Sequence, residues 1–544
     1  MFLDEEHIVA VLIKPLAWIF VWIVQLYHTI IHQAYVWWNV WVNDKQVVPK
    51  PASDSIVLIP AVELAQKIRN RQLTALEVIE AYIKRIELVD PMIHAFVQRN
   101  YQNAVETAKA IDSVLDAIEQ DSEELNNLAE TKPLLGVPFT IKDQFLIKGL
   151  RTTVGMPCRK NAELATDDAD IVKSLREAGA IPLGLSNVPE GIMWGEGTNT
   201  IYPRTLNPYD TRCAPGGSSS GEGALLGAAG SVIGVGSDIA GSIRVPALLN
   251  GIFGLKPSPH LSCTVGQIPP QFHKYQNEMY SIGPMCRYAV DLLPLFKILI
   301  GPDNSKKLRL DEPVDVQKLR FFSMERTGNK LNSPPMHSDT KGAFLKTIEH
   351  FKKVTKNNVP AVQFETAKYA ANFWFTSTSE EGGLSVGQYF GCFGKYEVRF
   401  FHELPKWLRG KSEHTSAVML ALGIEEFSKH ITSDRAAIEE MRDELRAEII
   451  ELLGDDGVLI WPSFPYASYF HSELLWNLLV GEYSALWNAL ALPVIACPVG
   501  LNDEGVPLGV QLISAPHNER LLIAAAIEIE KAFGGWQAPP GKPE

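Results

Sequence analysis

The sequence predicts an α/β fold in which a β-sheet is buried on both faces by helices, preceded by an N-terminal membrane helix. Short apolar runs alternate with helical segments through the middle of the chain, and similar runs return near the carboxyl terminus, as expected of a doubly covered sheet. A dense apolar and aromatic stretch at residues 8–42 predicts the membrane helix. The 544 residues, 46% of them hydrophobic, are enough to bury a substantial core.

The N-terminal stretch has the length of a bilayer span, because residues 8–31 supply the roughly 20 mostly apolar residues that a span requires. Trp37, Trp38 and Trp41 follow, where an interfacial aromatic belt would lie. Acidic residues precede the stretch and basic residues follow it, which favours a single-pass anchor with the following domain in the cytosol. A cleaved signal peptide and an amphipathic helix lying on the membrane surface remain alternatives.

A linker rich in turn formers at residues 49–55 separates this stretch from the rest of the chain. The chain therefore divides into a membrane anchor with its flank, residues 1–48, and a globular domain, residues 49–544. The net charge of −13 excludes a nucleic-acid partner, which would require a basic surface.

The globular domain is expected to begin with helices and to continue with alternating strands and helices. The expected helices cover residues 61–90, 103–119, 168–178, 221–229 and 435–453. The expected strands cover residues 136–142, 181–185, 232–235, 457–462, 493–498 and 507–513. The acidic stretch 121–130 is expected to be a solvated loop, and residues 300–430 give no clear pattern.

Two glycine-rich turns each carry serines that point to acyl chemistry. One contains Ser218 and the other contains Ser242. Glycine permits positive φ values and a close backbone approach, so peptide N–H groups can converge on one point, as a hydrolase needs in order to hold an oxyanion.

Ser219 lies at the centre of a Gly-x-Ser-x-Gly pattern, which is typical of a nucleophile elbow. An elbow needs a strand directly before the serine together with a histidine and an acid, whereas the preceding residues here suggest a turn and no histidine stands out. A phosphate-binding loop would need Gly-Lys-Ser/Thr at its end, and this loop ends in Glu222 and Gly223. Tight strand-to-helix packing is the structural alternative for the glycines.

Lys142 ends an apolar run and is a candidate base. A lysine at such a position commonly extends its amine to solvent. If the amine is instead buried beside serine hydroxyls, its neutral form is favoured, and a neutral amine can accept a proton. A hydrolase built in this way needs no histidine.

The segments around Lys142, Gly216-Gly-Ser218-Ser219 and Asp238-Ile-Ala-Gly-Ser242 together resemble the amidase signature hydrolases over roughly residues 50–537. Within the family, the segments beginning at Leu453, Asn207 and Phe533 are similar to the fatty-acid amide hydrolases, especially the second type. The resemblance implies a large mixed β-sheet and makes residues 49–544 an amidase signature catalytic domain.

The resemblance also implies a Ser-Ser-Lys triad. Ser242 would be the nucleophile that forms the acyl-enzyme, and Ser218, held by a cis peptide in the family, would relay a proton between Ser242 and Lys142. The oxyanion hole would consist of backbone N–H groups, with Ser219 in support. These N–H groups belong to Ile239, Ala240, Gly241 and Ser242.

Two further expectations concern single positions. Ala240 stands where the family usually has glycine, so a positive φ there would cost about 1 kcal/mol and displace an oxyanion donor. Ile192 and Met193 are similar in position to a family stretch beside the acyl channel, and they are expected either to line a substrate pocket or to be ordinary core residues.

The resemblance thus implies a membrane-anchored serine hydrolase that cleaves fatty-acid amides to a free fatty acid and an amine. Its partners would be the lipid amide substrate and the membrane, with no cofactor and no metal; homodimer formation is left open. Two other interpretations remain: another amidase signature enzyme acting on small amides or esters, such as the glutamine-hydrolysing component of a tRNA amidotransferase, and a non-catalytic membrane-tethered member of the family.

Overall fold

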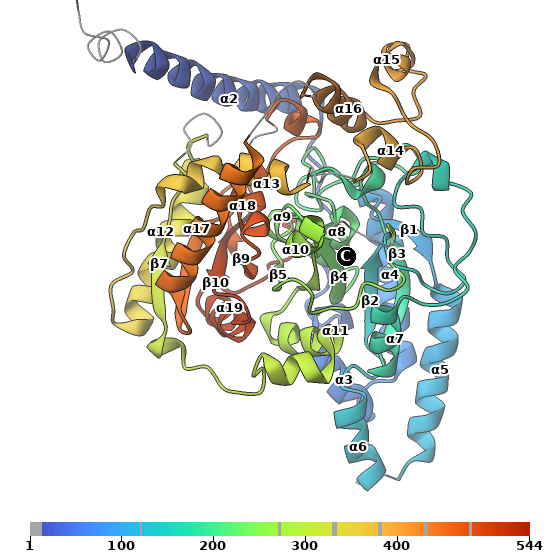
Figure 1. Cartoon of the computed structure of the whole chain (residues 1–544). Coiled ribbons are helices and arrows are strands. Elements are labelled where there is room, and N and C mark those ends of the chain that lie inside the picture. The colour runs from blue at the N-terminus through green and yellow to red at the C-terminus, as the bar shows by residue number, and fades with distance from the viewer. Residues whose placement is uncertain are drawn as a thin grey trace, which may run out of the picture.

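A ten-stranded mixed sheet forms the centre of the molecule (Figure 1). The computed structural model describes residues 14–119, 122–269, 274–328, 334–378, 383–428, 434–477 and 481–544. In spatial order the strands are β1 (Phe96–Arg99), β3 (Ile181–Ser186), β2 (Pro138–Lys142), β4 (Ile233–Asp238), β6 (Ser281–Cys286), β5 (Phe253–Lys256), β9 (Val494–Leu501), β10 (Pro507–Ser514), β8 (Gly457–Pro462) and β7 (Arg320–Ser323).

Parallel pairs join β2 to β3, β2 to β4 and β7 to β8, and the remaining neighbours are antiparallel. The three strands expected near the carboxyl terminus join the same sheet as the earlier ones, which confirms the expected mixed sheet.

Helices surround the sheet, and their bounds in chain order are α2 (Lys14–Val42), α3 (Ala61–Arg69), α4 (Ala75–Ile93), α5 (Tyr101–Ala117), α6 (Glu123–Thr131), α7 (Asp170–Glu177), α8 (Ser220–Gly227), α9 (Arg244–Leu249), α10 (Lys274–Met279), α11 (Leu292–Lys307), α12 (Ser338–Thr355), α13 (Ala370–Thr378), α14 (Val386–Phe390), α15 (Phe400–Leu408), α16 (Ser416–Ser428), α17 (Arg435–Leu453), α18 (Glu482–Ala489) and α19 (Glu519–Phe533).

The two faces of the sheet belong to different hydrophobic clusters. Successive side chains of a strand point to opposite faces, and in β8 the residues Val458 and Ile460 pack with α12 and α19 while Leu459 and Trp461 pack with α13, α17 and α18. Burial on both faces explains why the strands are continuous apolar runs in the sequence.

The prediction of a solvated loop at residues 121–130 is wrong in part, because residues 123–131 form the helix α6. The Ser122 hydroxyl accepts a hydrogen bond from the Leu125 N–H, which caps the first turn, and Glu123 and Glu124 lie at the positive end of the helix dipole. The N-terminal capping signal outweighs the charge of the segment.

The N-terminal stretch forms the long helix α2, and residues 1–13 lie outside the described part of the chain. None of the helices in the described residues combines the length and apolar character needed to cross a bilayer. The predicted transmembrane helix is therefore not confirmed. Polar side chains interrupt α2, and several of them bind the rest of the protein. His28 Nδ1 lies 2.8 Å from Asn477 Oδ1, His32 Nδ1 lies 2.8 Å from Glu473 Oε1, and the hydroxyls of Tyr27 and Tyr35 donate to backbone carbonyls.

Candidate active site

Lys142 occupies the last position of β2, between two parallel neighbours, and its side chain is fully buried. Its Nζ lies 2.7 Å from Ser218 Oγ, and it also contacts Ser237 Oγ at 2.8 Å and the Ser237 carbonyl at 3.4 Å. Burial lowers the pKa of Lys142 to about 7, although the charges of Asp238 and Glu222 oppose this shift. The amine can therefore be neutral at physiological pH and accept a proton.

Gly216 and Gly217, directly before Ser218, lie so close to neighbouring backbone atoms that a side chain would not fit. Gly216 has a φ of +83°, and a side chain on Gly217 would lie 2.5 Å from the Trp194 carbonyl oxygen. Only glycine tolerates this combination of conformation and contact. The peptide bond between Gly217 and Ser218 is cis, and the Ser218 side chain is buried.

The second glycine-rich turn lies against the first. The Ser219 N–H donates to the Ser242 carbonyl at 3.1 Å, which holds the two serine-bearing turns together. Ser242 is half-buried, and within the described part of the chain its hydroxyl has no hydrogen-bond partner. Among the described residues no protein group therefore competes for this hydroxyl.

Ser219 does not occupy a nucleophile elbow. Residues 214–218 before it form no strand, and its buried Oγ contacts no hydrogen-bonding group among the described residues. Lys142 reaches Ser218 instead. The elbow interpretation is therefore wrong, because the strand that would present the serine is missing.

The four backbone N–H groups expected in the oxyanion hole are not equivalent. The Gly241 N–H donates to Asp238 Oδ1 at 2.7 Å, so a protein carboxylate already occupies this donor. Gly241 has a φ of +118°, and an added side chain would lie 2.3 Å from Ser484 Oγ. Glycine at this position thus serves the shape of the turn, and the expected role of its N–H in the oxyanion hole needs correction.

Ala240 is not strained. It is absent from the residues with positive φ, so the backbone at this position suits alanine as well as glycine. Its carbonyl accepts a hydrogen bond from Ser484 Oγ at 2.5 Å, which ties the turn to α18. The departure from the usual family residue therefore does not displace the turn.

A buried ion pair between Asp238 and Arg244 stabilises the turn that carries Ser242. The Asp238 carboxylate accepts hydrogen bonds from Arg244, from Asn488 and from the backbone N–H groups of Gly241 and Ile243. Burial alone would raise the pKa of Asp238, but the Arg244 guanidinium holds it well below its usual range. Asp238 and Arg244 flank Ser242 in the sequence motif, whereas Ser484 and Asn488 lie in a distant segment that no local pattern connects to the site.

A second buried carboxylate, that of Glu222, lies close enough to Lys142 to raise the pKa of this amine. Glu222 Oε2 accepts a hydrogen bond from the Thr140 hydroxyl at 2.9 Å, and burial raises the pKa of Glu222 to about 7. Glu222 and Lys142 therefore titrate in the same pH range and influence each other. In the sequence Glu222 is evidence only against a phosphate-binding loop. No local sequence pattern around Glu222 indicates that it lies near Lys142.

Ile192 and Met193 precede the segment that packs against Gly217. Ile192 has a φ of +55°, an unusual conformation for a β-branched residue, and Met193 is 44% exposed. Met193 is thus not an ordinary core residue. Ile192 packs, partly buried, against a hydrophobic cluster that includes Val154, Met156 and Phe390. The expected role of Ile192 and Met193 in a substrate pocket stays a prediction.

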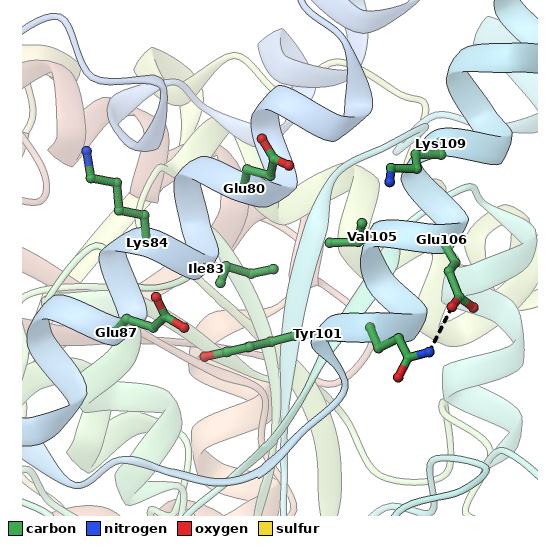
Figure 2. A pocket seen from close by; sticks show the side chains of 9 residues that line it. Glu80, Ile83, Lys84, Glu87, Tyr101, Val105, Glu106 and Lys109 are labelled. Carbon is green, nitrogen blue, oxygen red and sulfur yellow. Dashed lines mark hydrogen bonds between the residues drawn. The ribbon is translucent and has the colours of Figure 1, made fainter.

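A hollow of about 540 Å³ between α4 and α5 is separate from these residues (Figure 2). Charged side chains line it, including Glu80, Lys84 and Lys109, together with Ile83 and Val105. None of the predicted site residues borders this hollow.

Comparisons with known proteins identify the family of the chain. The Amidase family model matches residues 77–523. The chain is 39% identical to fatty-acid amide hydrolase 2 from Homo sapiens over 497 residues, which cover 90% of this chain and 92% of that protein. It is 26% identical to a glutamyl-tRNA(Gln) amidotransferase component from Lachnoclostridium phytofermentans, over 88% of this chain and 97% of that protein.

Among solved structures, a fatty acid amide hydrolase superposes with a TM-score of 0.67 at 22% identity, covering 89% of this chain and 87% of that chain. This likeness supports the fold, while the family model and the 39% identity over most of the chain establish the relationship. The chain belongs to the amidase signature family and is an amide hydrolase.

Proposed function

We propose that the protein hydrolyses long-chain fatty-acid amides through Ser242, Ser218 and Lys142. The observation that carries the mechanism is the 2.7 Å contact between Lys142 Nζ and Ser218 Oγ inside a fully buried site. The substrate class is supported by the 39% identity to a fatty-acid amide hydrolase, compared with 26% to an amidotransferase component.

In the first step Ser242 Oγ attacks the carbonyl carbon of the amide. The Ser242 proton passes to Ser218 Oγ while the proton of Ser218 passes to neutral Lys142. The carbonyl electrons move to the oxygen, where the N–H groups of Ile239, Ala240 and Ser242 stabilise the negative charge. Each such donor contributes about 3 to 4 kcal/mol to transition-state stability.

In the second step the C–N bond breaks. The Lys142 ammonium returns its proton through Ser218 to the departing nitrogen, so the amine leaves neutral and Ser242 carries the acyl group as an ester. Water then attacks the ester along the same proton path and releases the fatty acid. Because amines are poor leaving groups, protonation of nitrogen is the demanding part of the reaction.

A chain-length series tests this function. The rates for primary amides from acetyl to oleoyl are measured with purified full-length protein and with Ser242→Ala as the blank. The proposal expects kcat/KM to rise steadily with acyl length, because each buried methylene contributes about 0.8 kcal/mol. A preference for acetamide or glutamine would support a small-amide enzyme instead, and no turnover of any amide or ester would favour a non-catalytic member.

We also propose that the enzyme works at a membrane, held by the N-terminal segment, with the catalytic domain in the cytosol. Apolar side chains are exposed on α2, where Trp37 and Trp41 are 63% and 75% accessible, and on α15 and α16, where Leu408 and Phe427 are 69% and 66% accessible. Figure 1 places these three helices along the same side of the molecule. Such a patch suits the interfacial region of a bilayer.

Liposome flotation tests the membrane proposal. The full chain is expected to float with vesicles, and replacement of Trp37, Trp38 and Trp41 by serine is expected to reduce the bound fraction severalfold. Val114→Ser removes an exposed apolar side chain from α5, away from the patch, and serves as the control. Equal flotation of the wild type, the triple variant and the control would argue against docking through this face.

A further inference from the structure

A chain of buried hydrogen bonds leads from Lys142 away from the two serine-bearing turns. Ser237 Oγ donates to Gln144 Oε1 at 2.6 Å, and Gln144 Nε2 donates to the Tyr280 hydroxyl at 3.2 Å. The Tyr280 hydroxyl donates to Gln267 Oε1 at 2.6 Å. All five side chains are at most 5% exposed, so bulk water does not replace these partners.

The distances indicate which amide atom faces each hydroxyl, and with it the direction of the chain. Contacts of 2.6 Å are typical of O–H···O hydrogen bonds, and 3.2 Å suits an N–H donor. Because the Tyr280 proton goes to Gln267, the tyrosine oxygen accepts, and the Gln144 atom facing it must be the NH₂ group. The amide oxygen of Gln144 therefore faces Ser237 and can only accept.

This direction determines how neutral Lys142 is oriented. With its own proton committed to Gln144, Ser237 Oγ can only accept from Lys142, and the Ser237 carbonyl is also only an acceptor. The neutral amine has two N–H bonds, and these two acceptors use both. Its lone pair is left for the third neighbour, Ser218 Oγ, which must donate.

We propose that Gln144 is a positioning residue: by accepting the Ser237 hydroxyl proton, it turns the lone pair of Lys142 toward Ser218. The inference rests on the proposed function, since it deepens the role of Lys142 as the base. If the Gln144 amide were reversed or absent, the Ser237 hydroxyl could donate its proton to the lone pair of Lys142. Lys142 could then no longer accept a proton from Ser218. Gln144 itself touches no reacting atom.

The same network suits both protonation states of Lys142. When the amine becomes an ammonium, its three N–H bonds point at the same three acceptors, and only the proton between Lys142 and Ser218 has moved. The site therefore needs no rearrangement between the base step and the acid step, which is the advantage of a preorganised network.

The test measures the rate at which a fluorophosphonate phosphonylates Ser242, with loss of fluoride, as a function of pH in the full-length protein. Gln144→Met removes both hydrogen bonds at nearly constant volume and is expected to lower the maximal rate by roughly tenfold to a hundredfold. The matched control is Gln98→Met, which removes a comparable bond from Gln98 Nε2 to the Tyr202 hydroxyl outside the site. A maximal rate for Gln144→Met within about twofold of that control overturns the proposal.

Gln144→Glu separates positioning from a structural role. A carboxylate still accepts from Ser237, so the maximal rate at alkaline pH is expected to recover to within about threefold of the wild type, with the midpoint moved to higher pH because a nearby negative charge favours the ammonium. A variant as slow as Gln144→Met at every pH would contradict the role as acceptor.

A double-variant cycle covers the case in which Gln144→Met does not fold. Ser237→Ala removes the hydroxyl that Gln144 orients. Gln144→Leu, which cannot accept a hydrogen bond, is expected to slow the protein that keeps Ser237 but to leave the maximal rate of Ser237→Ala unchanged. Independent, multiplying effects would overturn the proposal.

Failure of the proposed function gives a different signature. If Lys142→Ala labels as fast as the wild type, Lys142 is not the base, whatever the Gln144 variants do. If labelling of the wild type is normal but no fatty-acid amide is cleaved, the substrate class is wrong and the Gln144 measurements still stand.

Discussion

Asp238 and Arg244 form a fully buried ion pair, with Arg244 Nε 3.0 Å from Asp238 Oδ2 and Arg244 Nη2 3.0 Å from Asp238 Oδ1. The pair bridges the turn that carries Ser242. Because both charges are buried, each depends on the other for its stability.

Arg244→Met is expected to lower the free energy of unfolding by about 3 to 5 kcal/mol, since it leaves the Asp238 carboxylate buried without its cation. Chemical denaturation monitored by fluorescence measures the change. Lys353→Met breaks a solvent-exposed pair with Glu349 on α12 and is expected to change little. Similar losses in the two variants would show that the buried pair has no special role.

The rate of Ser242 acylation is expected to rise with pH through a midpoint near 7 and to level off above it. The pKa of Lys142 is lowered to about 7, and only the deprotonated amine accepts a proton. Glu222→Gln removes a negative charge that raises this pKa, so the midpoint is expected to move to lower pH. A pH–rate profile of both proteins gives the answer, and an upward shift would contradict the assignment.

Gly241→Ala and Ala240→Gly are expected to differ sharply. The first places a methyl group 2.3 Å from Ser484 Oγ on a backbone with φ of +118°. It is expected to shift the turn and with it the neighbouring N–H groups of Ala240 and Ser242, and a loss of about a hundredfold or more in kcat is expected because these are the proposed oxyanion donors. The second changes a residue with ordinary φ and is expected to keep kcat within about threefold. Equal effects of the two substitutions on kcat would contradict the backbone conformation described for the turn that carries Ser242.

His32→Leu is expected to loosen α2 from the rest of the protein. His32 stacks on Tyr466 with ring centroids 4.0 Å apart and contacts the buried Glu473 carboxylate, so its removal leaves that carboxylate short of a partner. Limited proteolysis should then cut between α2 and α3 severalfold faster. Gln33→Leu alters an exposed neighbour and provides the control; equal cleavage rates would argue against docking through His32.

The sequence predicted the strands and helices whose pattern is local. The strand ending in Lys142 and the helix at residues 435–453 were predicted closely, because apolar runs and helical periodicity are preserved wherever one element packs on another. The four-residue strands β1, β5 and β7 were not predicted, since so few residues carry no period of their own. The six-residue strand β6 was also missed, because Gly283 and Pro284 in its sequence are residue types that are depleted in strands. They are strands because their neighbours in the sheet pair with them.

The residues of the candidate site also fall into those that the sequence indicates and those that only the fold reveals. Lys142, Ser218 and Ser242 stand in motifs that can be recognised from the sequence alone, and the structure brings the first two into contact. Ser484, Gln144 and Tyr280 carried no such signal, because their importance depends on which groups they meet across the fold. The normal φ of Ala240 could also be learned only from the structure.

The most direct test of the central claim is the identity of the nucleophile. Full-length protein is labelled with a fluorophosphonate and digested, and the modified peptide is sequenced by mass spectrometry. The label is expected on Ser242, to be lost in Ser242→Ala and to form at least a hundredfold more slowly in Lys142→Ala at neutral pH, consistent with the roughly 10²–10⁴-fold contribution of a general base. A label on Ser219, or undiminished labelling without Lys142, would contradict the account.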